Sequence, residues 1–229
     1  MDRTRRAEAA IASAQVVVGY SRYLKLIEDL TQGKELLSTG MTKEVDRCML
    51  ALRRAENGDT VALVSSGDPG IYGMAGLALE LAHKERIAVP IEVIPGVTSA
   101  TALAARLGAP LMLDFAAISL SDLLVPWEVI KRRLEAVAAA DLVVALYNPK
   151  SRKRQRQLDE ATEIFLRHRT GATPVGIGIS VGTDEEEIIV SDLDHFREFD
   201  ITMRSVVIIA NSITKLLDGW LVTPRGYRV

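Results

Sequence analysis

The segment Val61-Ala-Leu-Val-Ser-Ser-Gly-Asp-Pro-Gly-Ile-Tyr-Gly73 decides the fold of this chain. It lies on a continuous apolar run over 60–65, which is typical of a strand that is buried on both faces of a parallel sheet. A glycine-rich turn follows, and the pattern then predicts a helix over 71–84. Ligands of open α/β sheets bind where such strands end, so this turn is the first candidate binding site.

The turn at 66–70 has chemistry that suits a ligand. Gly67 and Gly70 allow positive φ and a close approach of the backbone, Asp68 offers a carboxylate to hydroxyl groups or a cation, and the following helix offers free N–H groups. The spacing matches neither a Walker motif nor GxGxxG, which disfavours a nucleoside triphosphate or a nicotinamide dinucleotide. Asp-Pro-Gly also makes an ordinary tight turn, so local physics alone leaves both interpretations open.

A second strand, turn and helix repeat this arrangement. The strand predicted over 91–94 leads through a Pro-Gly turn into a helix predicted over 98–107. Thr98 and Ser99 either cap that helix or present hydroxyl groups to the same ligand as Asp68. Two such turns on neighbouring parallel strands would line one crevice.

Strands and helices alternate along the first half of the chain, which predicts an α/β domain. Pro110 and Asp114 interrupt the alternation, so we expect an N-terminal α/β domain over 1–114 and a C-terminal α/β domain over 115–229. The remaining elements predicted for the first domain are a strand over 15–18 and helices over 3–14, 23–30 and 42–57. The second domain is predicted as a mixed sheet with strands over 116–120, 142–147, 175–180, 187–190 and 205–210 and helices over 126–140 and 156–169.

Composition excludes several classes of protein. The 229 residues are 48% hydrophobic and 25% charged, which is ordinary for a globular protein. The net charge of −2 argues against a general nucleic-acid binder. Cys48 is the single cysteine, which fits a reducing cytoplasm; His83, His168 and His195 lie far apart, so we expect no metal site. Neither a signal peptide nor a membrane span is predicted.

An ordered set of motifs resembles the tetrapyrrole (corrin/porphyrin) methylases over nearly the whole chain. The set comprises Gly67-Asp68-Pro69 with Tyr72-Gly73, then Pro95-Gly-Val-Thr-Ser-Ala100, then Leu146-Tyr-Asn-Pro149. More specific stretches, Asp114-Phe-Ala-Ala-Ile-Ser-Leu-Ser-Asp-Leu-Leu-Val-Pro-Trp127, Asn148-Pro-Lys-Ser151 and Thr223-Pro-Arg-Gly-Tyr227, are similar to the precorrin-3B C17-methyltransferase branch. The resemblance implies two α/β domains, with S-adenosylmethionine bound in the cleft between them and a homodimer as the usual assembly.

The resemblance also implies roles for individual residues. The residues expected to contact the cofactor are Ser66, Gly67, Asp68, Ile71, Thr98, Ser99, Tyr147, Asn148 and Gly182. The implied reaction is methyl transfer to C17 of a precorrin-3B or cobalt-factor III type macrocycle, coupled to ring contraction, in cobalamin biosynthesis. The methyl donor is already activated, so positioning of the two reactants can supply most of the catalysis. Ring contraction also needs proton transfer, for which Asp114, Ser121 and Asp122 are the candidates, although Asp122 could equally be a helix N-cap.

Five cations in seven residues follow the Asn-Pro motif, in Lys150-Ser-Arg-Lys-Arg-Gln-Arg156. A solvated loop or a nucleic-acid patch would have this composition. The cations would also attract a substrate with many carboxylates, and arginine suits carboxylates because it donates paired hydrogen bonds. We therefore expect Lys150, Arg152, Lys153 and Arg154 to steer and bind the substrate.

Two departures from the family pattern bear on activity. Members usually begin with a strand and a Gly-x-Gly-Pro-Gly loop, and this sequence starts at the point just after that loop, so we expect both to be missing. Leu113 stands where a histidine often precedes the Asp-Phe pair. Three alternatives therefore stay open: a methylase for another corrin carbon, a truncated binding protein without turnover, and an RNA or protein methyltransferase, which only the basic run supports.

Overall fold

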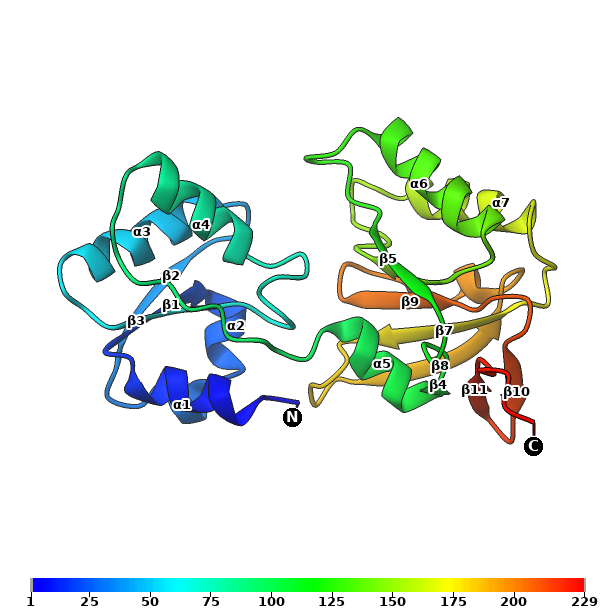
Figure 1. Ribbon diagram of the computed structural model, residues 1–229, viewed down its shortest axis with the longest axis horizontal. Helices are drawn as coiled ribbons and strands as arrows, with labels where there is room; N and C mark the ends of the chain where they lie inside the picture. The colour runs from blue at the N-terminus through cyan, green and yellow to red at the C-terminus, as the bar shows by residue number, and fades with distance from the viewer. Residues whose placement is uncertain (1, 229) are drawn as a thin grey trace. The chain divides into compact units, whose positions relative to one another are not determined.

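The computed structural model describes residues 2–228, which fall into two compact units divided in the sequence between Thr98 and Ser99. Figure 1 shows the helices and strands of each unit. Over the described residues the N-terminal unit has one three-stranded sheet, whereas the C-terminal unit has a five-stranded sheet and a second, three-stranded one. Each unit also has its own clusters of buried hydrophobic residues. The N-terminal unit contains, in chain order, α1 (Arg5–Ser13), β1 (Val16–Tyr20), α2 (Ser21–Lys25), the 3-10 turn Glu28–Leu30, β2 (Glu35–Thr39), α3 (Glu44–Glu56), β3 (Val61–Val64) and α4 (Ala75–Lys84).

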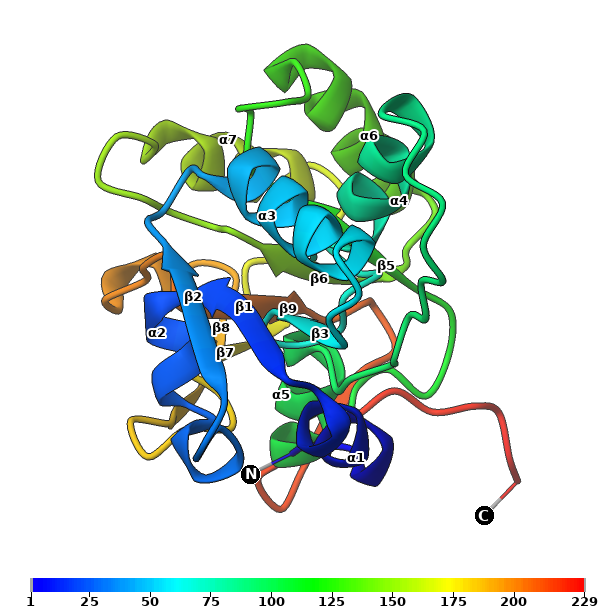
Figure 2. The ribbon, with the colours of Figure 1, turned by 90° about the vertical axis from the view of Figure 1, so that its left-hand side faces the viewer.

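The sheet of the N-terminal unit is parallel, with the strand order β2-β1-β3 (Figure 2). Val16 and Val18 point to the face that packs against α3, whereas Val17 points to the face that packs against α1 and α2. This alternation follows from the two-residue period of a strand, and it buries β1 on both faces. The central strand of the unit is therefore β1.

Two strand predictions for this unit need correction. The run over 60–65 forms β3, but β3 is an edge strand and all four of its residues remain partly exposed. Residues 91–94 pair with no strand in the described part of the chain, and Ile91 and Val93 are exposed. Both differences have the same physical reason, because an apolar, β-branched sequence suits a strand but does not provide its hydrogen-bonded neighbours. Residues 91–94 have no such neighbour among the described residues and form no strand, whereas β3 has a neighbour on one side and is therefore an edge strand.

The C-terminal unit is larger. Its elements are α5 (Ser99–Leu107), β4 (Gly108–Ala109), β5 (Phe115–Ser119), α6 (Trp127–Ala139), β6 (Val143–Tyr147), α7 (Arg156–Leu166), β7 (Pro174–Ile179), β8 (Glu187–Asp192), the 3-10 turn Phe196–Glu198, β9 (Ser205–Ile209), β10 (Lys215–Leu217) and β11 (Trp220–Val222). The main sheet has the order β5-β6-β9-β7-β8, in which only β5 and β6 are parallel neighbours, as the predicted mixed sheet requires.

Helices cover both faces of the five-stranded sheet. On one face α6 and α7 pack Leu134 and Phe165 against the strands, and both side chains are fully buried. On the other face α5 packs Leu103 and Leu107 against β6 and β9. Because α5 contributes its apolar stripe to this second core, it belongs to the C-terminal unit. The unit therefore begins at Ser99, sixteen residues earlier than the boundary expected at 115.

The sequence patterns did not predict β2 or the two strands of the hairpin β10–β11. These strands have exposed or mixed burial patterns, so their sequences contain no continuous apolar run that would indicate a strand. Within residues 2–228, no helix is long and apolar enough to cross a membrane. Over the same residues, no three His, Cys, Asp or Glu side chains come together in a way that could hold a metal ion.

Candidate cofactor and substrate sites

The turn after β3 and the turn at Pro95-Gly96 lie against each other in the N-terminal unit. A Cβ built on Gly96 would lie 2.1 Å from the carbonyl oxygen of Gly67, so only glycine allows this approach. Gly67 itself has a φ of 68°, in the left-handed region that favours glycine. The structure therefore brings the two predicted turns together, although only the first follows a hydrogen-bonded strand.

Asp68 holds this pair of turns together rather than presenting a free carboxylate. Its Oδ1 accepts a hydrogen bond from the Gly70 N–H at 2.8 Å, and its Oδ2 accepts one from the Gly96 N–H at 2.9 Å. Each oxygen thus stabilises a backbone donor, and hydrogen bonds to a charged acceptor are among the stronger ones in proteins. The carboxylate determines the shape of the turns, which then present backbone groups to a ligand.

The surface of these turns combines polar backbone with apolar side chains. Ser66 and Gly67 are exposed, and Ile71 is 42% exposed beside them. Thr98, at the end of the second turn, is buried, and its Cα would lie 3.7 Å from a Cβ built on Gly67. The N-cap of helix α4, Met74, makes no side-chain hydrogen bond, and the first helical N–H, that of Ala75, donates to the Pro69 carbonyl at 3.0 Å. Hydroxyls, backbone groups and an exposed isoleucine suit the ribose and base of an adenosyl group.

In the C-terminal unit, three strands end at the same edge of the sheet. Ser119, at the end of β5, pairs with Tyr147, at the end of β6. The strand β7 runs antiparallel to β9, as β6 does, so its end at Ile179 lies at this edge too. Three of the residues predicted to bind the cofactor or transfer protons, Asn148, Gly182 and Ser121, lie in the segments that leave this edge.

Tyr147 and Asn148 are fixed by hydrogen bonds within the unit. The Tyr147 hydroxyl accepts a hydrogen bond from the Ala100 N–H at 3.2 Å, in the first turn of α5, beside the predicted ligand residue Ser99. The side-chain amide of Asn148 donates to the Ser119 hydroxyl at 3.0 Å. Asn148 has a φ of 48°, a left-handed conformation that asparagine tolerates better than most residues.

Gly182 lies in the turn between β7 and β8. It has a φ of 81°, and its N–H donates to a Glu186 carboxylate oxygen at 2.6 Å. Glu186 also accepts a hydrogen bond from Arg106 of α5 at 3.1 Å. The turn is therefore tied to the helix that covers this face of the sheet.

The structure separates the three candidates for proton transfer. Asp114 precedes β5, whereas Ser121 and Asp122 follow it. Strands rise about 3.3 Å per residue, so the length of β5 places Asp114 roughly 20 Å from the other two along the chain direction. Asp122 accepts a hydrogen bond from Gln157 at 2.8 Å. The N-cap interpretation of Asp122 is wrong, because α6 begins later and Pro126 occupies its N-cap.

The basic run is divided between solvent and interior. Arg152 and Lys153 are exposed, and Lys150 is half-buried. Arg154, predicted to bind substrate with them, is instead 7% exposed: its guanidinium donates to the Asn148 carbonyl at 2.8 Å. Burial lowers the pKa of Arg154, and the nearby Asp122 carboxylate opposes that shift. A run of charges in the sequence could not show that one member turns inward.

Comparison with known proteins identifies the family of this chain and the class of its fold. The family model of the tetrapyrrole (corrin/porphyrin) methylases matches residues 2–196, and the chain belongs to that family. It is 46% identical to a cobalt-factor III methyltransferase from Priestia megaterium, over 98% of this chain but 42% of that protein. It is 45% identical to a probable cobalt-factor III C(17)-methyltransferase from Salmonella typhimurium, over 98% of this chain and 93% of the relative.

Solved structures give the same class. The crystal structure of the methyltransferase CobJ matches with a TM-score of 0.88 and 38% identity, over 96% of this chain and 93% of that one. A uroporphyrin-III C-methyltransferase from Thermus thermophilus, complexed with S-adenosylhomocysteine, shares the fold with a TM-score of 0.66 and 22% identity, over 90% of each chain. The predicted two-domain α/β methylase fold is thus confirmed.

Proposed function

We propose that this chain transfers a methyl group from S-adenosylmethionine to C17 of a precorrin-3B or cobalt-factor III type macrocycle, with contraction of the corrin ring, in cobalamin biosynthesis. The observation that carries the proposal is the pair of turns joined by Asp68, in a chain 45% identical to a relative named for that reaction. Because the relatives are named for cobalt-factor III, that compound is the first substrate to test.

The residues present fit the cofactor by their chemistry. S-Adenosylmethionine supplies an activated methyl group on a sulfonium. Gly67 and Gly96 bring two backbone turns together with no side chain between them, and Ile71 offers an apolar contact. We propose that Ser66, Thr98 and Ser99 hydrogen-bond the polar parts of the cofactor, and that Tyr147, Asn148 and Gly182 also contribute to its binding. The turns are preorganised, so little entropy is lost when they bind.

The C-terminal unit would then orient the macrocycle and manage protons. Arg152 and Lys153 are exposed beside the end of β6, where they attract a substrate with peripheral carboxylates. Asp122 is exposed, and its hydrogen bond from Gln157 orients the carboxylate, so it is a better candidate for proton transfer than Asp114 at the far end of β5. Ser121 lies next to it and accepts a hydrogen bond from Arg154.

We also propose that the protein acts in the cytoplasm as a homodimer. The single cysteine, Cys48, is fully buried, and desolvation raises the pKa of its thiol, which makes it an unreactive packing residue suited to a reducing compartment. Light scattering on the purified protein gives the assembly directly: twice the mass of 25.0 kDa is expected.

The decisive experiment follows both label and colour. The purified protein is incubated with methyl-labelled S-adenosylmethionine and either cobalt-factor III or precorrin-3B, and the macrocycle is examined for label and for a change in its absorption spectrum. Label at C17 together with a spectral change supports the proposal. Label at another carbon identifies a different corrin methylase. Cofactor binding without any transfer identifies a binding protein and contradicts the proposal.

A further inference from the structure

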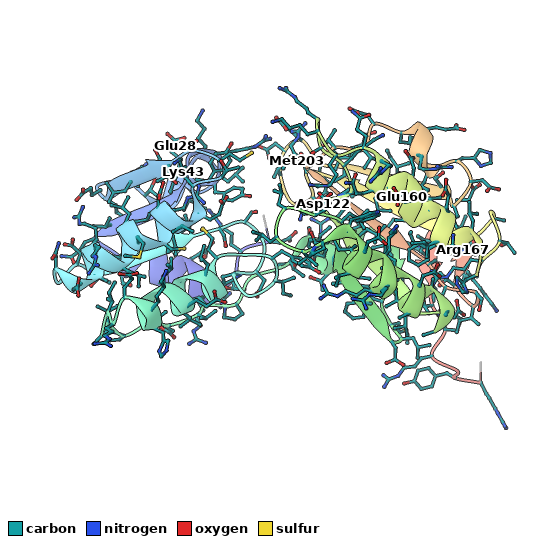
Figure 3. All side chains as sticks on the ribbon, turned by 90° about the horizontal axis from the view of Figure 1, so that it is seen from above. Glu28, Lys43, Asp122, Glu160, Arg167 and Met203 are labelled. Atoms are coloured by element: carbon teal, nitrogen blue, oxygen red, sulfur yellow. The ribbon has the colours of Figure 1, made fainter. Side chains whose placement is uncertain are left out.

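Two loops leave neighbouring parallel strands side by side in the C-terminal unit. The first, 120–126, connects β5 to α6, and the second, 148–155, connects β6 to α7. The strands β5 and β6 are paired along their whole length, with Ser119 opposite Tyr147, so both loops start from adjacent positions on the sheet edge. Figure 3 shows Asp122 on the first loop and Glu160 on α7.

Arg154 holds the bases of these two loops together. One guanidinium nitrogen donates to the Asn148 carbonyl at 2.8 Å, and the other lies 3.4 Å from the Ser121 hydroxyl. The backbone of Arg154 closes a turn on Ser151, with N···O distances of 2.8 and 3.3 Å in the two directions. A buried arginine that reaches both loops fixes their separation, and its planar fork makes the arrangement directional.

Two side-chain contacts fix the loops further. Asn148 donates to the Ser119 hydroxyl at 3.0 Å, and that same hydroxyl accepts the Ser121 N–H at 3.2 Å. At the other side, Gln157 of α7 donates to Asp122 at 2.8 Å. The first loop is therefore attached to its surroundings on both sides of Ser121.

The ends of the loops, in contrast, project into solvent. Leu123 and Leu124, the leucine tip, are 78% and 96% exposed. Arg152 and Lys153, the cationic tip, are exposed on the neighbouring loop. Exposing two adjacent leucines forgoes about 1.5–3 kcal/mol of burial for each. An exposed apolar patch rimmed by polar residues is typical of a binding surface.

We propose that the leucine tip packs on the face of the tetrapyrrole substrate, beside the cationic tip that binds its carboxylates, and that Arg154 is the positioning residue that sets the two tips side by side. The inference rests on the proposed function for its ligand. A flat apolar ring with acidic side chains around its rim needs an apolar contact and a cationic contact at adjacent positions. The two loops supply one of each.

The test compares two pairs of adjacent exposed leucines in the same unit. Leu123→Ser with Leu124→Ser removes the leucine tip, and Leu216→Ser with Leu217→Ser, on the hairpin strand β10, is the matched control. With cobalt-factor III as substrate, the tip variant should raise KM about tenfold or more, the equivalent of about 1.4 kcal/mol, and leave S-adenosylhomocysteine affinity unchanged. The control should change neither quantity.

Direct binding keeps this inference separate from the proposed function. Cobalt-factor III is titrated against the protein by absorbance, with no cofactor present, so the leucine tip is tested even if no methyl transfer occurs. Weaker binding by the tip variant alone supports the inference. Equal binding by all variants overturns it. A tip variant that changes from dimer to monomer with unaltered macrocycle affinity also overturns it, because the leucines would then contact a second copy of the chain.

Arg154 needs a readout beyond stability. Arg154→Lys keeps the positive charge but cannot reach Asn148 and Ser121 with one planar fork. We expect KM for cobalt-factor III to rise at least threefold at temperatures well below the melting point, with kcat and S-adenosylhomocysteine affinity nearly unchanged. A variant with a lower melting temperature and an unchanged KM would show that Arg154 serves folding alone.

Discussion

The carboxylate of Asp68 accepts a hydrogen bond from the Gly96 N–H at 2.9 Å, which joins two turns 28 residues apart in the chain. The other oxygen of the same carboxylate accepts the Gly70 N–H at 2.8 Å. The aspartate of the Gly-Asp-Pro motif thus connects the two turns by hydrogen bonds. By holding the second turn against the first, it shapes the surface that we propose binds the cofactor.

Asp68→Asn should weaken both the turns and the cofactor site. Asparagine has one acceptor oxygen, so its NH2 group would face one of the two backbone donors. We expect the free energy of unfolding to fall by about 1–3 kcal/mol, and the dissociation constant of S-adenosylhomocysteine, measured by calorimetry, to rise about tenfold. Asp46→Asn, on an exposed ion pair with Lys43, is the control and should change neither. Unchanged affinity in the Asp68 variant would contradict the assigned site.

Gly96→Ala should separate the two turns. The added Cβ would meet the Gly67 carbonyl oxygen at 2.1 Å, so the backbone has to move. We expect cofactor binding to fall below detection in calorimetry. Gly76→Ala is the matched control, because a Cβ there has no neighbour within 4 Å and the site is helical. It should raise stability by up to about 1 kcal/mol and leave binding intact.

Removal of the exposed cations should slow substrate capture. Arg152→Gln with Lys153→Gln should lower kcat/KM for cobalt-factor III at low ionic strength and flatten its dependence on salt, since screening acts on charges that steer from a distance. Arg132→Gln with Arg133→Gln, two exposed arginines on α6, is the control. If both pairs lower kcat/KM equally, net charge rather than position is responsible.

Arg169 should prove important for the stability of the C-terminal unit. It is buried, and its guanidinium donates to the carbonyls of Ala210 and Leu142 at 2.6 Å each. Arg169→Met removes the guanidinium donors from one buried carbonyl, that of Ala210, and one part-buried carbonyl, that of Leu142, and we expect a loss of about 3 kcal/mol in urea denaturation. Arg167→Met, at an exposed ion pair with Glu135, should cost less than about 1 kcal/mol. Equal losses of stability in the two variants would contradict the idea that the buried hydrogen bonds of Arg169 stabilise the unit more than the exposed ion pair of Arg167.

The pair His195 and Asp192 predicts a pH effect of known sign. The His195 ring lies 2.7 Å from an Asp192 oxygen, and that hydrogen bond raises the pKa of His195 while it lowers the pKa of Asp192. For His195, the stabilisation is therefore complete below the ordinary histidine pKa and is lost as pH rises through the elevated value. Asp192→Asn should lower the pKa of His195 in an NMR titration; an unchanged pKa would rule out the carboxylate as its cause.

Much of the fold could be predicted because local patterns decide it. The apolar run over 142–147 became β6, and the helical period over 42–57 became α3. Predictions failed where a neighbour decides the outcome. Residues 91–94 have the composition of a strand but no hydrogen-bonded partner, and β2 forms beside β1 without an apolar run of its own.

The site shows the same division. The sequence by itself determined that glycines, Asp68 and hydroxyl residues occur together at two turns, because glycine allows the positive φ and the close backbone approach that such turns require. Only the tertiary structure decided that the Asp68 carboxylate accepts a hydrogen bond from the Gly96 N–H. It also decided that Arg154 is buried while Arg152 and Lys153 are exposed to solvent. A hydrogen bond depends on the position of both partners, and residues distant in sequence acquire those positions only when the chain is folded.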